Sequence, residues 1–185
     1  MAHFEPLAQF ILSFEGGFVN DPKDRGGATN RGVTIGTWRS QGYDKNGDGV
    51  IDVKDLRLIT AEDATRIMRR NYWNRYRADS INDQSVANIL VDWLWLSGRW
   101  AIVLVQEMLG LKADGIVGPK TIAAINSVSP DALFVRIKDR RIQYIDDLIK
   151  RKPSQKRFEN GWRRRLDAIR YGSTIDNNKN KITWS

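Results

Sequence analysis

Two carboxylates near the start of the chain have the residue types and surroundings that glycosidic bond chemistry requires. Glu15 follows Phe14 at the end of an apolar run and precedes Gly16-Gly17. Apolar surroundings favour the protonated form of a carboxyl group, which is the form that a general acid needs near neutral pH. Asp24 lies in a turn-rich, more exposed segment, where a carboxyl group stays ionised. Two carboxyl groups in unlike environments are the basic requirement of glycoside hydrolysis.

The elements expected to position these carboxylates are mainly helical. Apolar residues at helical spacing predict a helix over residues 4–15 that ends at the two glycines, and residues 18–35 predict a loop with a short β-hairpin. Taken alone, a glutamate before two glycines is most often a surface residue at a helix end. Further helices are predicted over residues 60–73, 84–97, 99–110, 119–126, 130–150 and 154–171.

The composition excludes several kinds of catalytic device. Cysteine is absent and His3 is the only histidine, which argues against disulfides, Ser-His-Asp triads and His-rich zinc sites. Carboxylates, hydroxyls and backbone groups are left to carry any chemistry. No apolar stretch is long enough to cross a bilayer, and the first apolar run lacks a basic leader and a small-residue cleavage site.

The segment around Glu15 is a dense and contiguous motif. Its elements are Glu15-Gly16-Gly17-Phe18, Pro22, Asp24-Arg25-Gly26-Gly27-Ala28-Thr29 and Gly32-Val33-Thr34. This string resembles the opening motif of glycoside hydrolase family 108, a family of N-acetylmuramidases. The resemblance implies a mainly α, lysozyme-like two-lobed fold with a short β-hairpin near the active site. It also implies hydrolysis of the β-1,4 bond between N-acetylmuramic acid and N-acetylglucosamine, with Glu15 as the general acid and no cofactor for catalysis.

A second resemblance concerns the order of Glu15, Asp24 and Thr29 along the chain. Phage-type lysozymes carry a glutamate, then an aspartate nine positions on, then a threonine a few residues further. By that resemblance, Asp24 and Thr29 would position a water on the other face of the sugar or stabilise the oxocarbenium ion.

Four aromatic residues are candidates for substrate binding. Residues 61–74 resemble the family's helix that ends in Tyr-Trp, which makes Tyr72 and Trp73 candidates for the wall of the cleft. Where family members often show Val-Asn-x-Gly, this chain has Trp95-Leu96-Ser97-Gly98. Trp93 and Trp95 are therefore candidates to replace the missing asparagine by stacking on sugar. Burial in the core is the alternative for all four side chains.

The second half of the chain resembles the peptidoglycan-binding module that accompanies this family. The residues that carry this resemblance are Leu104, Gln106, Leu109-Gly110, Asp114-Gly115, Gly118-Pro119, Thr121, Ala124 and Asn126. We therefore expect residues 1–98 to form a catalytic muramidase lobe, residues 99–172 to form a helical peptidoglycan-binding lobe, and residues 173–185 to form a polar tail that frays.

Residues 44–55 match the twelve-residue EF-hand pattern. Oxygen ligands fall at positions 1, 3, 5, 9 and 12, a glycine stands at position 6, and the residue at position 7 offers its carbonyl. The predicted ligands are Asp44, Asn46, Asp48, Val50, Asp52 and Asp55. Asp55 replaces the usual bidentate glutamate, which should weaken binding. We expect a structural Ca²⁺ in this loop, and the alternative is an Asp- and Gly-rich surface turn.

The net charge of +8 is concentrated in residues 136–170, which hold 13 Lys and Arg against 5 Asp and Glu. Such a basic face favours polyanions, here anionic polymers of the cell envelope, and its alternative is a solvated helix face. Its apolar positions recur at helical spacing, so we expect them to pack inward and all the charges to face outward.

Three functions from different classes follow from these patterns. The first is a peptidoglycan hydrolase, and the second is a non-catalytic wall-binding or secretion-associated protein on the same fold. Nucleic-acid binding through residues 136–170 is the third, although the sequence contains no recognised nucleic-acid motif. For the hydrolase we expect a monomer that is made in the cytoplasm without a signal peptide and acts on the wall in the periplasm or outside after release.

Overall fold

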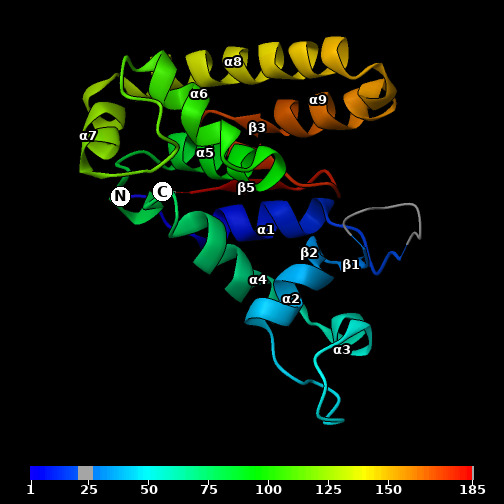
Figure 1. Ribbon diagram of the computed structural model, residues 1–185. Helices are drawn as coiled ribbons and strands as arrows, with labels where there is room; N and C mark the ends of the chain where they lie inside the picture. Colours follow the sequence, from blue (N-terminus) through cyan, green and yellow to red (C-terminus); the bar gives the residue numbers. More distant parts are fainter. Residues whose placement is uncertain (21–26, 185) are drawn as a thin grey trace.

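The computed structural model describes residues 1–20 and 27–184. Two groups of elements lie on either side of α1 (Figure 1), and α4 leads from one to the other. One group contains the long helix α8 with α5, α6 and α9, and the other contains the β1–β2 hairpin, α2 and α3. None of the helices in the described residues is long and apolar enough to cross a membrane.

The elements are mainly helical, as the sequence predicts. The helices are α1 (Glu5–Phe14), α2 (Ile35–Gln41), α3 (Val53–Leu58), α4 (Ala61–Met68), α5 (Gln84–Ser97), α6 (Trp100–Met108), α7 (Pro119–Ser127), α8 (Pro130–Arg151) and α9 (Glu159–Ala168). Shorter helical turns span Arg69–Trp73, Ala78–Ser80 and Pro153–Phe158. The strands are β1 (Thr29–Asn30), β2 (Val33–Thr34), β3 (Ile169–Arg170), β4 (Ser173–Ile175) and β5 (Lys181–Thr183).

The group that contains the β1–β2 hairpin, α2 and α3 is the smaller lobe, and it has its own hydrophobic core. Trp38 of α2 lies at its centre and is completely buried against apolar side chains from the hairpin, α3 and α4. The hairpin turn is Arg31-Gly32, and both residues have positive φ angles, 49° and 75°, as a tight two-residue turn requires. Thr60 begins α4 with a capping box, in which its side chain accepts from Asp63 and the Asp63 carboxylate accepts from Thr60.

The larger lobe has a core that crosses the boundary expected near residue 98. Apolar residues of α1 and α5, which precede that boundary, pack in one cluster with those of α6, α8 and α9, which follow it. Elements from both sides of the expected 98/99 boundary therefore share one core, and a second core lies within residues 28–67.

Two expectations for the C-terminal segment are wrong. Residues 154–171 do not form one helix: a short helical turn leads into α9, which ends at Ala168 where β3 begins. The tail is not frayed up to residue 184, because β4 and β5 pair antiparallel with each other and β4 pairs with β3. Ile182 and Thr174 are buried in this small sheet. Its few apolar residues alternate with polar ones over very short strands, a pattern too brief to distinguish from a polar tail.

Candidate active site

Glu15 lies immediately after α1, where the chain changes from helix to extended backbone. Its φ and ψ angles are −79° and 131°, and its N–H donates to the Leu12 carbonyl to close the helix. The side chain is 17% exposed. A carboxyl group in this position reaches solvent yet is held by the surrounding protein.

Two donors from distant parts of the chain orient the Glu15 carboxylate. The Trp95 indole N–H donates to Oε1 at 2.8 Å, and Arg165 Nη1 donates to the same oxygen at 3.3 Å. Trp95 belongs to α5 and Arg165 to α9, so three elements converge on this oxygen. The second oxygen, Oε2, accepts none of the hydrogen bonds found among the described residues and is the one left for a ligand.

Behind Arg165 lies an aspartate that no solvent reaches. Asp92 is fully buried in α5, and its Oδ1 accepts from Arg165 Nε and Nη2 at 3.0 and 2.8 Å. Arg141 of α8 donates to the other oxygen, Oδ2, at 2.8 Å and is itself buried. We call Glu15, Asp92, Arg141 and Arg165 the charge cluster.

The buried members of the charge cluster are ionised. Burial alone would raise the pKa of Asp92, but Arg165 and Arg141 outweigh it and hold that pKa below its usual 3.8. Burial alone would lower the pKa of the Arg165 guanidinium, but the carboxylates of Asp92 and Glu15 leave it raised. The phenyl rings of Phe10 and Phe14 lie 5.7 and 5.3 Å from the Arg165 guanidinium and complete its surroundings. The site of Glu15 is therefore apolar on one side and charged on the other.

The hairpin closes tightly over the Glu15 site. A Cβ atom at Gly32 would lie 2.8 Å from Glu15 Oε2 and would collide with the Trp95 ring. Gly32 also has a φ of +75°, a conformation that side chains other than glycine adopt rarely. The glycine of the motif is thus required twice, once by the turn and once by the close approach to Glu15.

The four aromatic candidates separate into two kinds. Trp95 contacts Glu15, and the Tyr72 ring packs edge-on against it with 4.6 Å between ring centroids. Burial raises the pKa of the Tyr72 hydroxyl, with Arg75 lowering it and the Glu15 charge adding to the rise, so this hydroxyl is neutral. Both side chains are partly exposed, as residues of a cleft wall would be.

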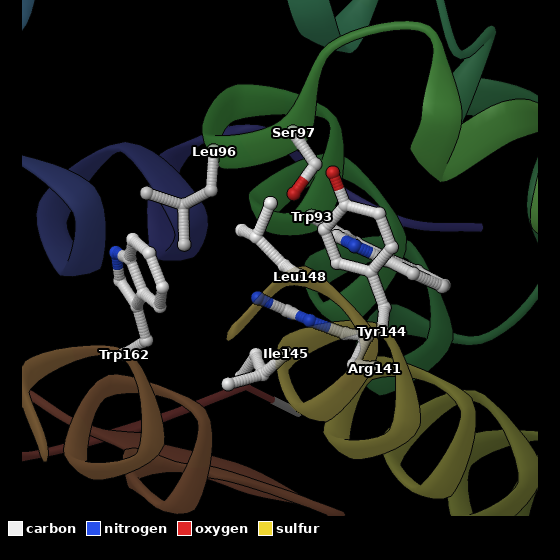
Figure 2. A pocket seen from close by; sticks show the side chains of 8 residues that line it. All are labelled: Trp93, Leu96, Ser97, Arg141, Tyr144, Ile145, Leu148 and Trp162. Atoms are coloured by element: carbon white, nitrogen blue, oxygen red, sulfur yellow. The ribbon is translucent and has the colours of Figure 1, made fainter. Parts of the chain in front are cut away.

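Trp73 and Trp93 have packing positions. Trp73 is completely buried, and its indole N–H donates to Asp79 at 2.7 Å. Trp93 is 2% exposed and lines a separate cavity of about 80 Å³ between α5, α8 and α9. Figure 2 shows Trp93 behind the Tyr144 ring and beside the Arg141 guanidinium, which extends from α8 into the same cavity. For these two tryptophans, the structure agrees with the burial alternative rather than with a cleft wall.

Asp24 and Thr29 are the two remaining motif residues. Asp24 lies outside the described residues. Thr29 is in β1 of the hairpin, opposite Thr34 of β2, and its backbone pairs with Val19. The hairpin therefore brings Thr29 onto the same two-stranded element as Gly32, which touches Glu15.

Most of the chain is similar to known protein families. Residues 8–98 match the family model of glycosyl hydrolase 108, and residues 100–167 match the model of a predicted peptidoglycan domain. Residues 8–98 belong to the glycosyl hydrolase 108 family. The structure of Brucella abortus SagA is similar at a TM-score of 0.72 and 29% sequence identity, and the match covers 90% of each chain. No curated protein matches the chain.

Within this glycosyl hydrolase 108 region, the loop at residues 44–55 is closed by its own backbone donors. The Asp44 carboxylate accepts from two glycine N–H groups at 2.7 Å each, and the buried Asp55 carboxylate accepts from three backbone N–H groups of the loop. Asp48 pairs with Lys54 at 3.1 Å. The other predicted ligands in this loop are Asn46, the exposed Val50, and Asp52, which caps α3.

The loop carboxylates do not converge on one point. Among residues 1–20 and 27–184, no group of three or more His, Cys, Asp or Glu side chains is placed to hold a metal ion. The N–H bonds to Asp44 and Asp55 use oxygens that the EF-hand pattern assigns to calcium. Calcium binding therefore stays a prediction that requires these side chains to turn.

The expectation that all charges of residues 136–170 face outward is wrong for several of them. Arg141 and Arg165 are buried in the charge cluster, and Arg163 pairs with Asp146 and Glu159. The exposed cations of this segment are Arg136, Lys150, Arg151, Lys152, Lys156, Arg157, Arg164 and Arg170. The outward charge is consequently weaker than the count of residues suggests.

Sequence reasoning missed Asp92 and the two arginines that pair with it, although each had a signal. Asp92 interrupts an almost wholly apolar helix, where an unpaired acid would be very costly. Arg141 stands between Ile137 and Ile145 at intervals of four on the apolar face of α8. A charge on an apolar stripe predicts a buried partner, but nothing local says which one.

Proposed function

We propose that this protein is a peptidoglycan hydrolase that cleaves the β-1,4 bond between N-acetylmuramic acid and N-acetylglucosamine, with Glu15 as the general acid. The observation that carries the proposal is the Glu15 carboxyl, whose Oε1 is held at the junction of three elements by Trp95 and Arg165, while Oε2 has no hydrogen-bond donor among the described residues. Membership of residues 8–98 in glycosyl hydrolase 108 and the adjoining peptidoglycan domain support the same substrate class.

The proposed chemistry uses the two oxygens of Glu15 differently. Oε1 stays bound to its two donors, and a proton on Oε2 passes to the glycosidic oxygen as the bond to the leaving sugar breaks. The carboxylate that remains gains the full strength of the Arg165 contact, because a guanidinium bonds an anion more strongly than a neutral acid. Asp24 and Thr29 are assigned to the water that attacks the other face of the sugar.

The bond that is cut can be identified directly. Purified sacculi digested with the protein and analysed by mass spectrometry should give fragments with N-acetylmuramic acid at the new reducing end. New N-acetylglucosamine ends would assign the other glycosidic bond. Fragments released with intact glycan strands would point to a peptide-bond or amide hydrolase and would contradict the proposal.

A second candidate function is a wall-binding protein that does not cut. The observation in its favour is the salt bridge between Glu15 and Arg165, a contact that a purely structural carboxylate would also make. Zymography on cell walls separates the two candidates. Cleared bands indicate hydrolysis, whereas wall that is bound but not cleared indicates a binder.

A further inference from the structure

A second hollow lies next to the Glu15 site, on the side of Trp95 that carries Tyr72. It has a volume of about 480 Å³, which is within the range of sites that hold small ligands. The end of α2 in the smaller lobe, the helical turn after α4 and the end of α5 all contribute to its walls. The polar side chains in those walls are Gln41, Arg70, Asn71 and Arg75.

Among the described residues, the side chains that line this hollow carry positive charge and no paired acid. Arg70 and Arg75 are exposed, and neither takes part in an ion pair found among the described residues. Their neighbours Arg66 and Arg69 are paired, with Asp63 and Glu5 respectively. The residues that line the hollow include no aspartate or glutamate. Two arginines in one hollow without an acid present donors that suit a carboxylate.

One residue that lines the hollow also carries an acceptor without a donor. The side-chain oxygen of Gln41 is buried and has no hydrogen-bond partner among the described residues. A buried acceptor without a partner costs free energy, so it gains from a ligand that brings an N–H group. A ligand for this hollow should therefore combine a carboxylate with an amide N–H, a combination that peptides have.

The position of the hollow ties it to the reaction. Trp95 lines the hollow and also donates its indole N–H to Glu15. A peptide bound there would be one aromatic side chain away from the proposed acid. Muramic acid is the sugar of the glycan that carries a peptide, and this peptide ends in carboxylates.

We propose that this hollow binds the peptide attached to the muramic acid next to the scissile bond, with Arg70 and Arg75 on its carboxylate and Gln41 on one of its N–H groups. The inference rests on the proposed function, because it names a further part of the same substrate. It makes the enzyme selective for glycan strands that still carry their peptides.

The test compares two soluble substrates, glycan strands with their peptides and the same strands after an amidase has removed them. Replacing both arginines, R70Q with R75Q, should raise KM about tenfold on peptide-bearing strands and leave kcat unchanged, since charge-assisted hydrogen bonds are lost from binding only. KM on stripped strands should not change. The matched control R66Q with R69Q, which removes two paired arginines outside the hollow, should alter neither substrate.

Two results would overturn this inference. Equal KM for the parent and R70Q/R75Q on peptide-bearing strands would show that the arginines bind no peptide. A rise in KM of the same size on both substrates would show that the two arginines attract the glycan in general and do not bind the peptide.

A binding measurement keeps the test independent of cleavage. Titration calorimetry of the parent with the peptide-bearing strands, using Glu15→Gln if the parent cuts them, should show tighter binding than with stripped strands, and R70Q/R75Q should remove the difference. If the parent cuts neither substrate but shows this difference, the hydrolase proposal fails and the peptide site stands. Equal affinity for both strands would refute the peptide site.

Discussion

The charge cluster and the loop at residues 44–55 both surround carboxylates with donors, but they recruit those donors from different distances along the chain. Asp92 is bound by arginines 49 and 73 residues away, from α8 and α9. In the loop, every donor to Asp44 and Asp55 lies within ten residues of its acceptor. The first arrangement exists only when the larger lobe is packed, whereas the second needs only its own twelve residues.

This difference has a functional consequence. Because Arg165 bonds both Asp92 and Glu15, the orientation of the proposed acid depends on the packing of α5 against α8 and α9. The loop has no such tie to Glu15 among the contacts of the described residues. Damage to the cluster should therefore affect stability and activity together, and damage to the loop should affect stability alone.

The largest effect on stability is expected from Asp92→Asn. This change leaves the buried Arg141 guanidinium without a counter-charge and leaves Arg165 with Glu15 alone, and breaking a buried pair in this way typically costs about 3–5 kcal/mol of unfolding free energy. The matched control is Asp167→Asn, whose partner Lys138 lies near the surface at 3.5 Å and should cost under about 1 kcal/mol. Urea denaturation measures both, and similar losses for the two variants would contradict a buried cluster.

The dependence of the unfolding free energy on pH also distinguishes the charge cluster from the loop. The pKa of Asp92 is lower in the folded protein than its usual 3.8, so its stabilising contribution is fully present above about pH 4. It is lost as the pH falls through the lower folded-state pKa. Asp92→Asn should therefore flatten the acid limb of a plot of unfolding free energy against pH, and an unchanged limb would show that Asp92 does not titrate with folding.

A smaller effect, on activity as well as stability, is expected from Gly32→Ala. The positive φ costs roughly 1–2 kcal/mol for any side chain, and the added Cβ would also push against Glu15 and Trp95. Gly172→Ala is the control, because its φ of +82° imposes the same strain in open space. We expect Gly172→Ala to keep its wall-clearing rate in a turbidity assay while Gly32→Ala loses most of it. Equal rates would place the hairpin away from the reaction.

For the loop, we expect calcium to raise the melting temperature by mass action and a chelator to return it. Asp48→Asn should abolish the calcium shift and leave the metal-free melting temperature nearly unchanged, because the Lys54 pair is exposed and asparagine can still accept from the Val50 N–H. A melting temperature that responds to neither calcium nor chelator, together with no heat in calorimetry, would show that the loop binds no calcium.

The smallest effect is expected at the exposed cations of residues 136–170. Changing Arg151, Arg157 and Arg164 to Gln should leave the unfolding free energy within about 0.5 kcal/mol, as is usual for surface substitutions. Binding to sacculi should weaken at low salt and converge with the parent as salt rises, because screening acts over about 8 Å at physiological ionic strength. Reversal of Arg165 cannot serve in such a test, because that side chain is buried. Unchanged binding at low salt would identify these cations as a solvated face.

The sequence predicts well those structural features that depend on residues close together along the chain. The end of α1 at the two glycines, the helix that begins at residue 60 and the short hairpin within residues 18–35 follow from residues a few positions apart. The sequence does not predict the partner of Asp92, because the pairing depends on how three helices pack. It also leaves the place of Trp73 open between cleft and core, since an aromatic residue at a helix end gives the same pattern in both.

The most direct test of the central claim is the rate at which Glu15→Gln solubilises purified sacculi. Glutamine can still accept the Trp95 N–H bond, and the side chain is partly exposed, so the variant should fold. Its rate should fall by about 10²–10⁴-fold, the usual loss when a general acid is removed. The control Glu62→Gln, an exposed residue of α4, should retain the parent rate. A rate for Glu15→Gln close to that of the parent, with both proteins folded, would contradict the assignment of Glu15 as the acid.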